Sequence, residues 1–115
     1  MALTTDEYRT HLKLGAKRAG IDLPEPALPQ RGHVTLNGLR FSFLDWGGDD
    51  LPTMLFLHGG GLNAHTWDLC CASLRTSFRC VALEQRGHGD SDWSPDADYS
   101  LASQREDVRA FVEHL

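Results

Sequence analysis

The stretch that decides the fold is residues 54–63, which read MLFLHGGGLN. Four apolar residues in a row, followed by turn-forming residues, predict a strand buried on both faces, as in parallel sheets. The three glycines that follow let the backbone turn sharply and let another molecule approach its amide groups. Helical periodicity then begins at Trp67. A strand, a glycine turn and a helix in this order direct backbone N–H groups at a negative charge.

A second buried strand is predicted over residues 80–83, which read CVAL. The helix between the two strands is expected to turn inward an apolar stripe with the spacing i, i+3, i+4, i+7, made of Trp67, Cys70, Cys71 and Leu74. A strand, a helix and a strand joined by a link of this length predict parallel pairing with a right-handed crossover.

The segment before this unit is predicted to form an antiparallel hairpin. Apolar and polar residues alternate on both sides of the Asn37-Gly38 pair, which is the strongest two-residue signal for a hairpin turn. Asp45 and the pair Asp49-Asp50 follow, but they lack further oxygen donors at regular spacing, so no metal site is predicted there.

The two ends of the chain are predicted to be helical. Residues 1–20 form an accessory helix with Thr4 and Glu7 as a capping box, and a proline-rich, extended connector covers residues 21–32. A last helix begins near Ser100, and its apolar residues are expected to share one face: Leu101, Val108, Phe111, Val112 and Leu115. The prediction is therefore an α/β domain over residues 33–115, in which an antiparallel hairpin is followed by a parallel strand–helix–strand–helix unit.

Composition narrows the function. The 115 residues suffice for one domain, and a content of 41% hydrophobic and 23% charged residues excludes a disordered or collagen-like chain. The net charge of -5 argues against nucleic acid or an anionic membrane as a partner. No apolar run approaches the ~20 residues of a membrane helix. Three cysteines give neither a disulfide framework nor zinc spacing, so we expect a cytoplasmic protein without a metal or cofactor.

One interpretation of the glycine turn is a dinucleotide site. Residues 59–64 fit the pattern G-x-G-x-x-A, and Glu84 follows at about the distance of a ribose-binding carboxylate. Three features count against this site: His58 precedes the first glycine, a hairpin precedes the glycine strand, and residues 86–89 (RGHG) have no part in it.

The two turn motifs taken together give another interpretation. The sequence LHGGG at 57–61 after one buried strand, and RGHGDS at 86–91 after the next, resemble the N-terminal third to half of an α/β-hydrolase. The resemblance covers roughly residues 33–115 and implies the sheet order first, second, fourth, third, fifth. Glu84 departs from the family pattern, which often has aspartate two residues before the arginine.

The resemblance implies roles for the turn residues. In that family the glycine turn supplies part of the oxyanion hole, and the best candidates are the amides of Gly60 and Gly61. Each such donor is worth ~3 kcal/mol to the transition state. Gly59, Asn63 and Trp67 border the substrate side, although Asn63 is expected mainly to hold the turn and Trp67 mainly to fill the core. The resemblance implies structural roles in the loops for His58, Arg86 and His88.

The sequence contains no G-x-S-x-G motif, so the nucleophile and the catalytic histidine, which follow in the family's order, are not among these residues. The triplet 89–91 (GDS) resembles the start of another serine hydrolase class, but it lies inside the second turn. We therefore expect the 115-residue chain alone to be inactive and the complete protein to hydrolyse a small ester-like substrate. Relatives with an aspartate nucleophile, which open epoxides or displace halide, share the same first half.

The implied strand order leaves the strand Met54–Leu57 at the edge of the sheet, and an exposed apolar edge is an association site. We expect a second chain or a second copy to cover it. The third possibility is an interaction module without catalytic activity.

Overall fold

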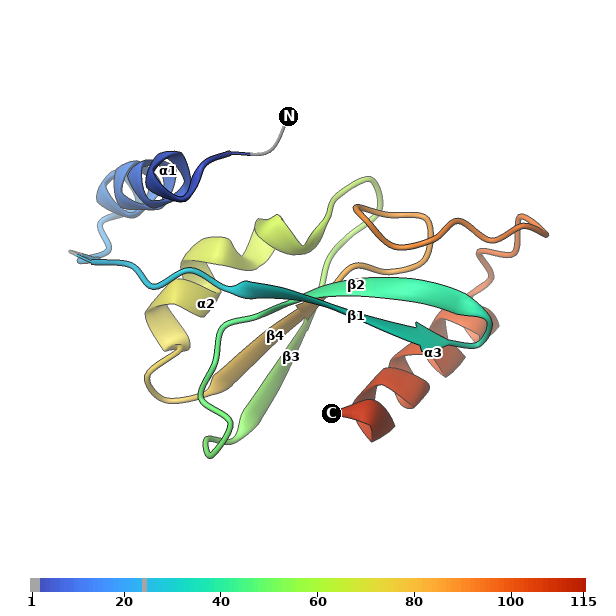
Figure 1. Cartoon of the computed structure of the whole chain (residues 1–115). Coiled ribbons are helices and arrows are strands. Elements are labelled where there is room, and N and C mark those ends of the chain that lie inside the picture. Colours follow the sequence, from blue (N-terminus) through green and yellow to red (C-terminus); the bar gives the residue numbers. More distant parts are fainter. Residues whose placement is uncertain (1–2, 24) are drawn as a thin grey trace.

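The computed structural model describes residues 3–23 and 25–115. These residues form a sheet with helices around it (Figure 1). In chain order its elements are α1 (Thr5–Ala19), β1 (Gln30–Leu36), β2 (Leu39–Asp45), β3 (Thr53–Leu57), the 3-10 helix η1 (Ala64–Trp67), α2 (Asp68–Leu74), β4 (Arg79–Leu83) and α3 (Leu101–His114). None of the helices in the described residues is long and apolar enough to cross a membrane.

The sheet has the strand order β1-β2-β4-β3. β1 and β2 form the antiparallel hairpin around Asn37-Gly38, and β2 also pairs antiparallel with β4. β3 pairs in parallel with β4, so Leu57 and Leu83 are partners at the carboxyl ends of the two strands. The predicted hairpin, the parallel unit and the order of these four strands are confirmed, and β3 lies at the edge of the described sheet.

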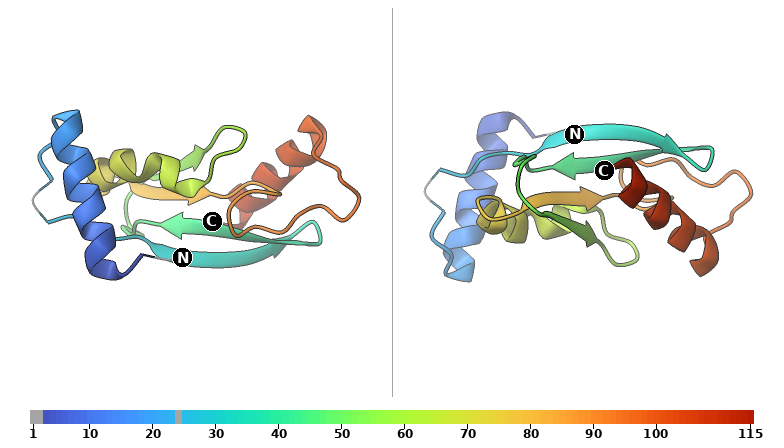
Figure 2. Two further views of the ribbon diagram at one scale, coloured as in Figure 1. Left: turned by 90° about the horizontal axis from the view of Figure 1, so that it is seen from above. Right: turned by 90° about the horizontal axis from the view of Figure 1, so that it is seen from below.

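Helices cover both faces of the sheet, with α2 on one face and α3 on the other (Figure 2). On the α3 side, Phe111 packs against Phe43, with ring centroids 5.1 Å apart. On the α2 side, Cys71 and Cys80 lie in a second buried cluster. Because side chains alternate between the two faces of a strand, β4 supplies both clusters, with Val81 and Leu83 on the α3 side and Cys80 on the α2 side.

Helix α1 lies beside α2 at one end of the sheet (Figure 2). Its capping box is formed as predicted, since the Thr4 side chain accepts a hydrogen bond from the Glu7 N–H and the Glu7 side chain accepts one from the Thr4 N–H. Gly20 ends the helix in a left-handed conformation, with φ of 74°. Leu12 and Ala16 are its buried residues.

The hairpin begins earlier than the sequence analysis predicted. β1 starts at Gln30, inside the stretch assigned to the connector. Glycine is depleted in strands, so the presence of Gly32 hid the strand character of these residues from the sequence analysis. The structure gives the reason for the glycine, because a Cβ at this position would lie 2.3 Å from the Phe43 ring. The aromatic ring fills the space above the glycine.

Two predicted helix stripes need correction. Cys70 is exposed and Ala72 is buried in its place, because the segment starts as a 3-10 turn with three residues per turn, which shifts the phase of α2. In α3, Leu101 is 84% exposed and Val112 is 55% exposed. The face that α3 turns to the sheet carries a buried aspartate, described below, together with Phe111.

Candidate active site

Two turns meet at the carboxyl ends of β3 and β4. Because the strands are parallel and in register to their last residues, residues 58–63 and 84–91 leave the same edge of the sheet and lie side by side (Figure 1). This edge is where open α/β sheets bind ligands. The predicted motif residues are therefore neighbours in space.

His58 joins the first turn to the second. Its side chain is buried, and its Nε2 accepts a hydrogen bond from the Gln85 N–H at 3.1 Å. The other ring nitrogen, Nδ1, therefore carries the proton and donates to the Gly59 carbonyl at 2.9 Å. The Gln85 side chain donates to the His58 carbonyl at 2.6 Å. His58 thus links the first turn to the second.

His88 makes the second connection. Its Nδ1 donates to the Arg86 carbonyl at 3.0 Å, and its Nε2 accepts the Gly61 N–H at 3.2 Å. Its ring lies against that of His58, with centroids 4.8 Å apart. Gly61 has φ of 76°, a left-handed conformation that favours glycine.

Gly60 differs from Gly61. Among the described residues no hydrogen bond uses the Gly60 N–H, and a Cβ at this position would meet no atom within 4 Å. The turn itself is closed by a hydrogen bond from the Leu62 N–H to the Gly59 carbonyl, at 3.2 Å. The arrangement leaves the Gly60 N–H, unlike that of Gly61, without a hydrogen-bond partner among the described residues at the end of β3, and a free backbone donor is what an anionic oxygen requires.

Glu84 lies beneath both turns and is fully buried. One carboxylate oxygen accepts from the Arg31 guanidinium at 2.7 Å and from the Asp90 N–H at 2.9 Å, and the other accepts from the Ala64 N–H at 3.2 Å. Burial alone raises the pKa of Glu84, but these hydrogen bonds outweigh it and lower the pKa below its ordinary value. Gly89 is required beside it, because a Cβ there would lie 2.1 Å from a Glu84 oxygen.

This position of Glu84 removes the dinucleotide interpretation of the sequence. A ribose-binding carboxylate must reach the ligand, whereas both Glu84 oxygens are committed inside the protein. The sequence placed Glu84 at the end of a strand, but it gave no sign of its partner Arg31, which lies in the stretch assigned to the connector.

Arg86 anchors the second turn to α3. Its guanidinium binds the Asp107 carboxylate through two hydrogen bonds, of 2.6 and 2.9 Å, and donates to the Asp98 carbonyl at 2.8 Å. Asp107 also accepts from the Asn37 side chain at 3.0 Å. Arg86 thus connects the second turn to α3, and Asp107 is a partner that the sequence analysis missed.

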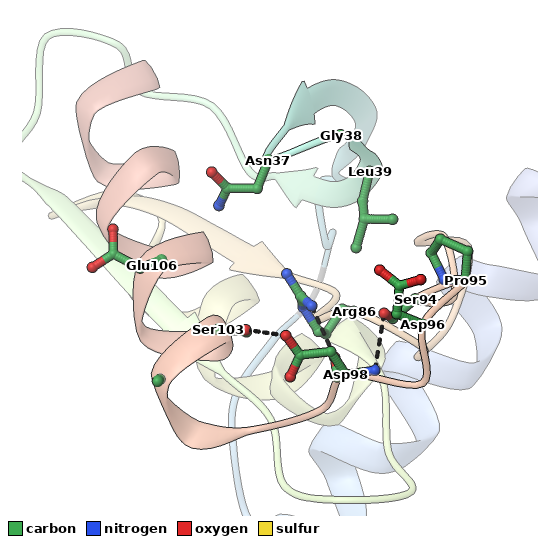
Figure 3. A pocket seen from close by; sticks show the side chains of 11 residues that line it. Asn37, Gly38, Leu39, Arg86, Ser94, Pro95, Asp96, Asp98, Ser103 and Glu106 are labelled. Carbon is green, nitrogen blue, oxygen red and sulfur yellow. Dashed lines mark hydrogen bonds between the residues drawn. The ribbon is translucent and has the colours of Figure 1, made fainter.

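A cavity of about 510 Å³ adjoins Arg86, between the hairpin turn and the start of α3 (Figure 3). Its walls carry the acidic residues Asp96, Asp98 and Glu106. Hydrogen bonds from Ser103 and Ser100 lower the pKa of Asp98 to about 2. No residue of the glycine turn lines this cavity, so it is not the site at the ends of β3 and β4.

The remaining candidate residues make contacts within the described part of the chain. Asn63 caps η1 by accepting the His65 N–H at 2.9 Å. The Trp67 ring packs on Phe56, with centroids 5.3 Å apart. Ser91 is buried, and its hydroxyl donates to the Glu84 carbonyl while accepting the Ser42 N–H at 2.9 Å, so it is not poised as a nucleophile.

Comparison with known proteins decides the family. A family model described as alpha/beta hydrolase fold matches residues 52–115, which include both turns. The chain belongs to the α/β-hydrolase fold family.

Several α/β-hydrolases resemble it in sequence. The Mycobacterium tuberculosis protein named Esterase Rv0045c is 39% identical over 110 residues, which are 96% of this chain and 34% of that protein. Epoxide hydrolase 1 of Caenorhabditis elegans is 33% identical over 84 residues, covering 72% of this chain and 21% of that protein. The chain thus spans about a third of the length of the first of these relatives and about a fifth of the second.

Solved structures agree. The structure of the M. tuberculosis esterase Rv0045c superposes with a TM-score of 0.69 at 34% sequence identity, covering 97% of this chain and 36% of that one. The fold of this α/β-hydrolase chain therefore matches that of this solved esterase over nearly its whole length.

The central role of Glu84 in this α/β-hydrolase chain predicts a pH-dependent stability. Glu84→Gln should lower the free energy of unfolding at pH 7 by about 2 kcal/mol, because buried N–H donors lose a charged acceptor. A carboxyl whose pKa is lowered on folding stabilises the fold above its unfolded pKa, and this contribution is lost as pH falls. The deficit should therefore shrink below pH 4.5, the ordinary value for this group. Urea unfolding at several pH values measures it.

The matched control is Glu113→Gln, which removes an exposed carboxylate that pairs with Arg109 on α3. This variant should cost no more than about 0.5 kcal/mol, as exposed helix pairs do. Equal losses in the two variants, or a Glu84→Gln deficit that does not change with pH, would contradict the assignment.

Proposed function

We propose that this chain is the N-terminal part of a hydrolase that cleaves an ester-like bond by covalent catalysis, with the Gly60 N–H as an oxyanion-hole donor. The observation that carries the proposal is the unused N–H of Gly60 beside open space, at the edge where the two family turns meet. Similarity to a protein named as an esterase, over 96% of this chain, supports an ester substrate.

The proposed chemistry follows from where charge develops. Attack on an acyl carbonyl moves negative charge onto its oxygen, and a fixed N–H in a site without water stabilises that charge. The hydrogen bond from Gly61 to His88 supports Gly60 rather than Gly61 as the donor, so the proposal narrows the two expected amides to one. Gly61 and His88 then position the turn, and Gly59 and Gly60 keep the approach to it free of side chains.

The nucleophile and the catalytic histidine are proposed to come from residues outside these 115. The sequence has no G-x-S-x-G motif, and the chain spans 34% of the esterase relative. The 115-residue chain alone is therefore proposed to be inactive. The likeness to an epoxide hydrolase keeps an aspartate nucleophile as the second candidate, since its oxyanion turn would occupy the same place.

The test joins residues 1–115 to the C-terminal two-thirds of the M. tuberculosis esterase and measures hydrolysis of p-nitrophenyl acetate. The joined protein should be active, and the chain alone should give no rate above that of buffer. Gly60→Pro, which lacks the N–H, should reduce kcat by about 10²–10³-fold, the usual effect of losing one oxyanion donor.

Gly60→Ala is the matched control, because it keeps the N–H and its Cβ would enter open space. Its kcat should stay within a few-fold of the parent. A proline variant as active as the alanine variant, in a protein that melts at the same temperature, would overturn the role of Gly60. Residues 1–115 joined instead to the C-terminal part of the epoxide hydrolase relative would favour the second candidate if that fusion turned over styrene oxide while the esterase fusion hydrolysed no ester.

We also propose that the free edge of β3 is an interface, filled by a strand of a second chain or of a second copy. β3 pairs on one side only within the described sheet, and Leu57 is 39% exposed. An unpaired apolar edge offers backbone groups for another strand to pair with.

Sedimentation of the 115-residue chain at micromolar concentration tests this interface. We expect dimers or larger species, and we expect Leu55→Pro, which cannot donate to a new ladder, to shift the population toward monomer. The control Thr35→Pro sits on β1 at the opposite edge of the sheet and should leave the association unchanged. A single sharp monomer boundary for the parent chain would contradict the interface.

A cytoplasmic location completes the proposal. Its support is that Cys70, Cys71 and Cys80 are all free thiols, as expected in a reducing compartment. Recovery of the native protein from cells with its cysteines oxidised would count against it.

A further inference from the structure

The turn of the hairpin carries two residues whose functional groups can react with each other. Asn37 and Gly38 connect β1 to β2 beyond the last ladder pair, Leu36 and Leu39, and both are exposed. They also line the cavity that adjoins Arg86 (Figure 3). An asparagine followed by a glycine is a turn signal, but it also places a side-chain amide next to an unshielded backbone nitrogen.

The Gly38 nitrogen is the nucleophile of this pair. No hydrogen bond in the described part of the chain uses the Gly38 N–H, because the ladder of the hairpin ends at Leu36 and Leu39. A Cβ at position 38 would meet no atom within 4 Å, and glycine has none, so no side chain shields the nitrogen. The nitrogen can therefore lose its proton to solvent and attack a neighbouring carbonyl carbon.

The electrophile is Cγ, the carbon of the Asn37 side-chain amide. The Asn37 Nδ2 donates a hydrogen bond to Asp107 Oδ1 at 3.0 Å, and this bond holds the amide away from the backbone. A hydrogen bond to a charged group of this strength leaves the side chain free in roughly one molecule in ten to one in a hundred. Because turns open locally more easily than the strands beside them, this fraction suffices for a slow reaction.

The other asparagine of the chain, Asn63, lacks these features. Its Oδ1 accepts the His65 N–H at 2.9 Å. The nitrogen that follows it belongs to Ala64, which is fully buried and donates to Glu84 at 3.2 Å. Both groups that would have to react at Asn63 are therefore committed to other partners, whereas the nitrogen after Asn37 is free.

We propose that Asn37 is a site of spontaneous covalent modification, at which the Gly38 nitrogen attacks Cγ and the side-chain amide is lost as ammonia. The nitrogen gives up its proton as the N–Cγ bond forms, and the Cγ–Nδ2 bond breaks as Nδ2 takes up a proton, which leaves a succinimide ring. Water then adds to one of the two ring carbonyls and opens the ring to aspartate or isoaspartate. The overall reaction consumes one water and releases one ammonia, without an oxidant or a reductant.

This modification acts on the contact that anchors the second turn to α3. The Asp107 oxygen that accepts Asn37 Nδ2 also accepts Arg86 Nη2, at 2.9 Å. A carboxylate at position 37 has no hydrogen to donate, so it repels Asp107 and competes with it for the guanidinium. Isoaspartate also carries the backbone through its side chain, which breaks the two-residue turn. Either product therefore weakens the pairing of Arg86 with Asp107.

The test is to age the 115-residue chain in mildly alkaline buffer at body temperature and to follow its peptides by mass spectrometry. We expect the Asn37 peptide to gain one mass unit and to become a substrate of isoaspartyl methyltransferase, at least about tenfold faster than any change at Asn63. In urea, which removes the hydrogen bond to Asp107, Asn37 should react no more than about a hundredfold faster than in the folded chain. Asn37→Gln is the matched control, because its longer side chain must close a larger ring, and it should gain no mass in the same period.

Asn37→Asp produces one of the two products directly and tests the effect on Arg86. The Arg86 Nε–H donates to Asp107 at 2.6 Å, and its exchange with water is measured by NMR. Exchange should become at least about tenfold faster in this variant, because a hydrogen bond between charged groups contributes that much. Asn63→Asp adds the same charge at an N-cap that aspartate serves equally well, and it should leave the exchange unchanged.

A folded chain whose Asn37 peptide keeps its mass, while the same peptide in urea is converted, would overturn the proposal, because the turn would then protect the amide. Equal conversion at Asn37 and Asn63 would overturn it as well. Unchanged exchange of the Arg86 Nε–H in a folded Asn37→Asp variant would contradict the effect on the second turn. The ageing experiment uses the parent chain, so it decides even where a variant fails to fold, and none of these measurements depends on ester cleavage.

Discussion

The buried carboxylate of Glu84 holds the functional edge of this chain together. It binds the Arg31 side chain from β1, the Ala64 N–H that follows the glycine turn, and the Asp90 N–H in the second turn. A buried carboxylate is stable only when its oxygens accept hydrogen bonds. The fold must therefore bring these three segments together around Glu84. The longer glutamate side chain, where the family often has aspartate, spans this distance from the first position after β4, and Gly89 leaves room for it.

The accessibility of Gly60 follows from this arrangement. His58 and His88 take up the neighbouring polar groups of the two turns, with each ring accepting one N–H and donating to one carbonyl. The turn is thereby fixed by side chains at its base, while the Gly60 N–H has no hydrogen-bond partner among the described residues. A donor fixed before substrate arrives needs no reorganisation during the reaction, which is the physical basis of oxyanion stabilisation.

Local signals in the sequence were sufficient for much of the fold. The apolar run at 54–57, the Asn37-Gly38 turn and the Thr4 capping box each predicted an element that the structure contains. The predictions from sequence failed where two local preferences compete. Gly32 concealed the first residues of β1, and a 3-10 start changed which side of α2 faces the core.

The candidate site was predictable only in part. The glycine turn and the RGHG turn could be predicted from their residue types, and the parallel pairing of β3 and β4 places them next to each other. The residues that hold these turns in place could not be predicted, because Arg31 is 53 positions from Glu84 and Asp107 is 21 positions from Arg86. Each of these charged residues is of a type that usually lies on the surface, and only the folded structure shows that its charge is paired inside the protein.

The central claim is that the glycine turn is held from beneath and leaves Gly60 N–H free. Amide hydrogen exchange at residues 59–61, measured by NMR on the 115-residue chain, tests it directly. We predict that the Gly61 N–H, which is bonded to His88, exchanges at least about tenfold more slowly than that of Gly60, which should exchange near the rate of an unstructured glycine. Protection of Gly60 equal to or greater than that of Gly61 would contradict the account.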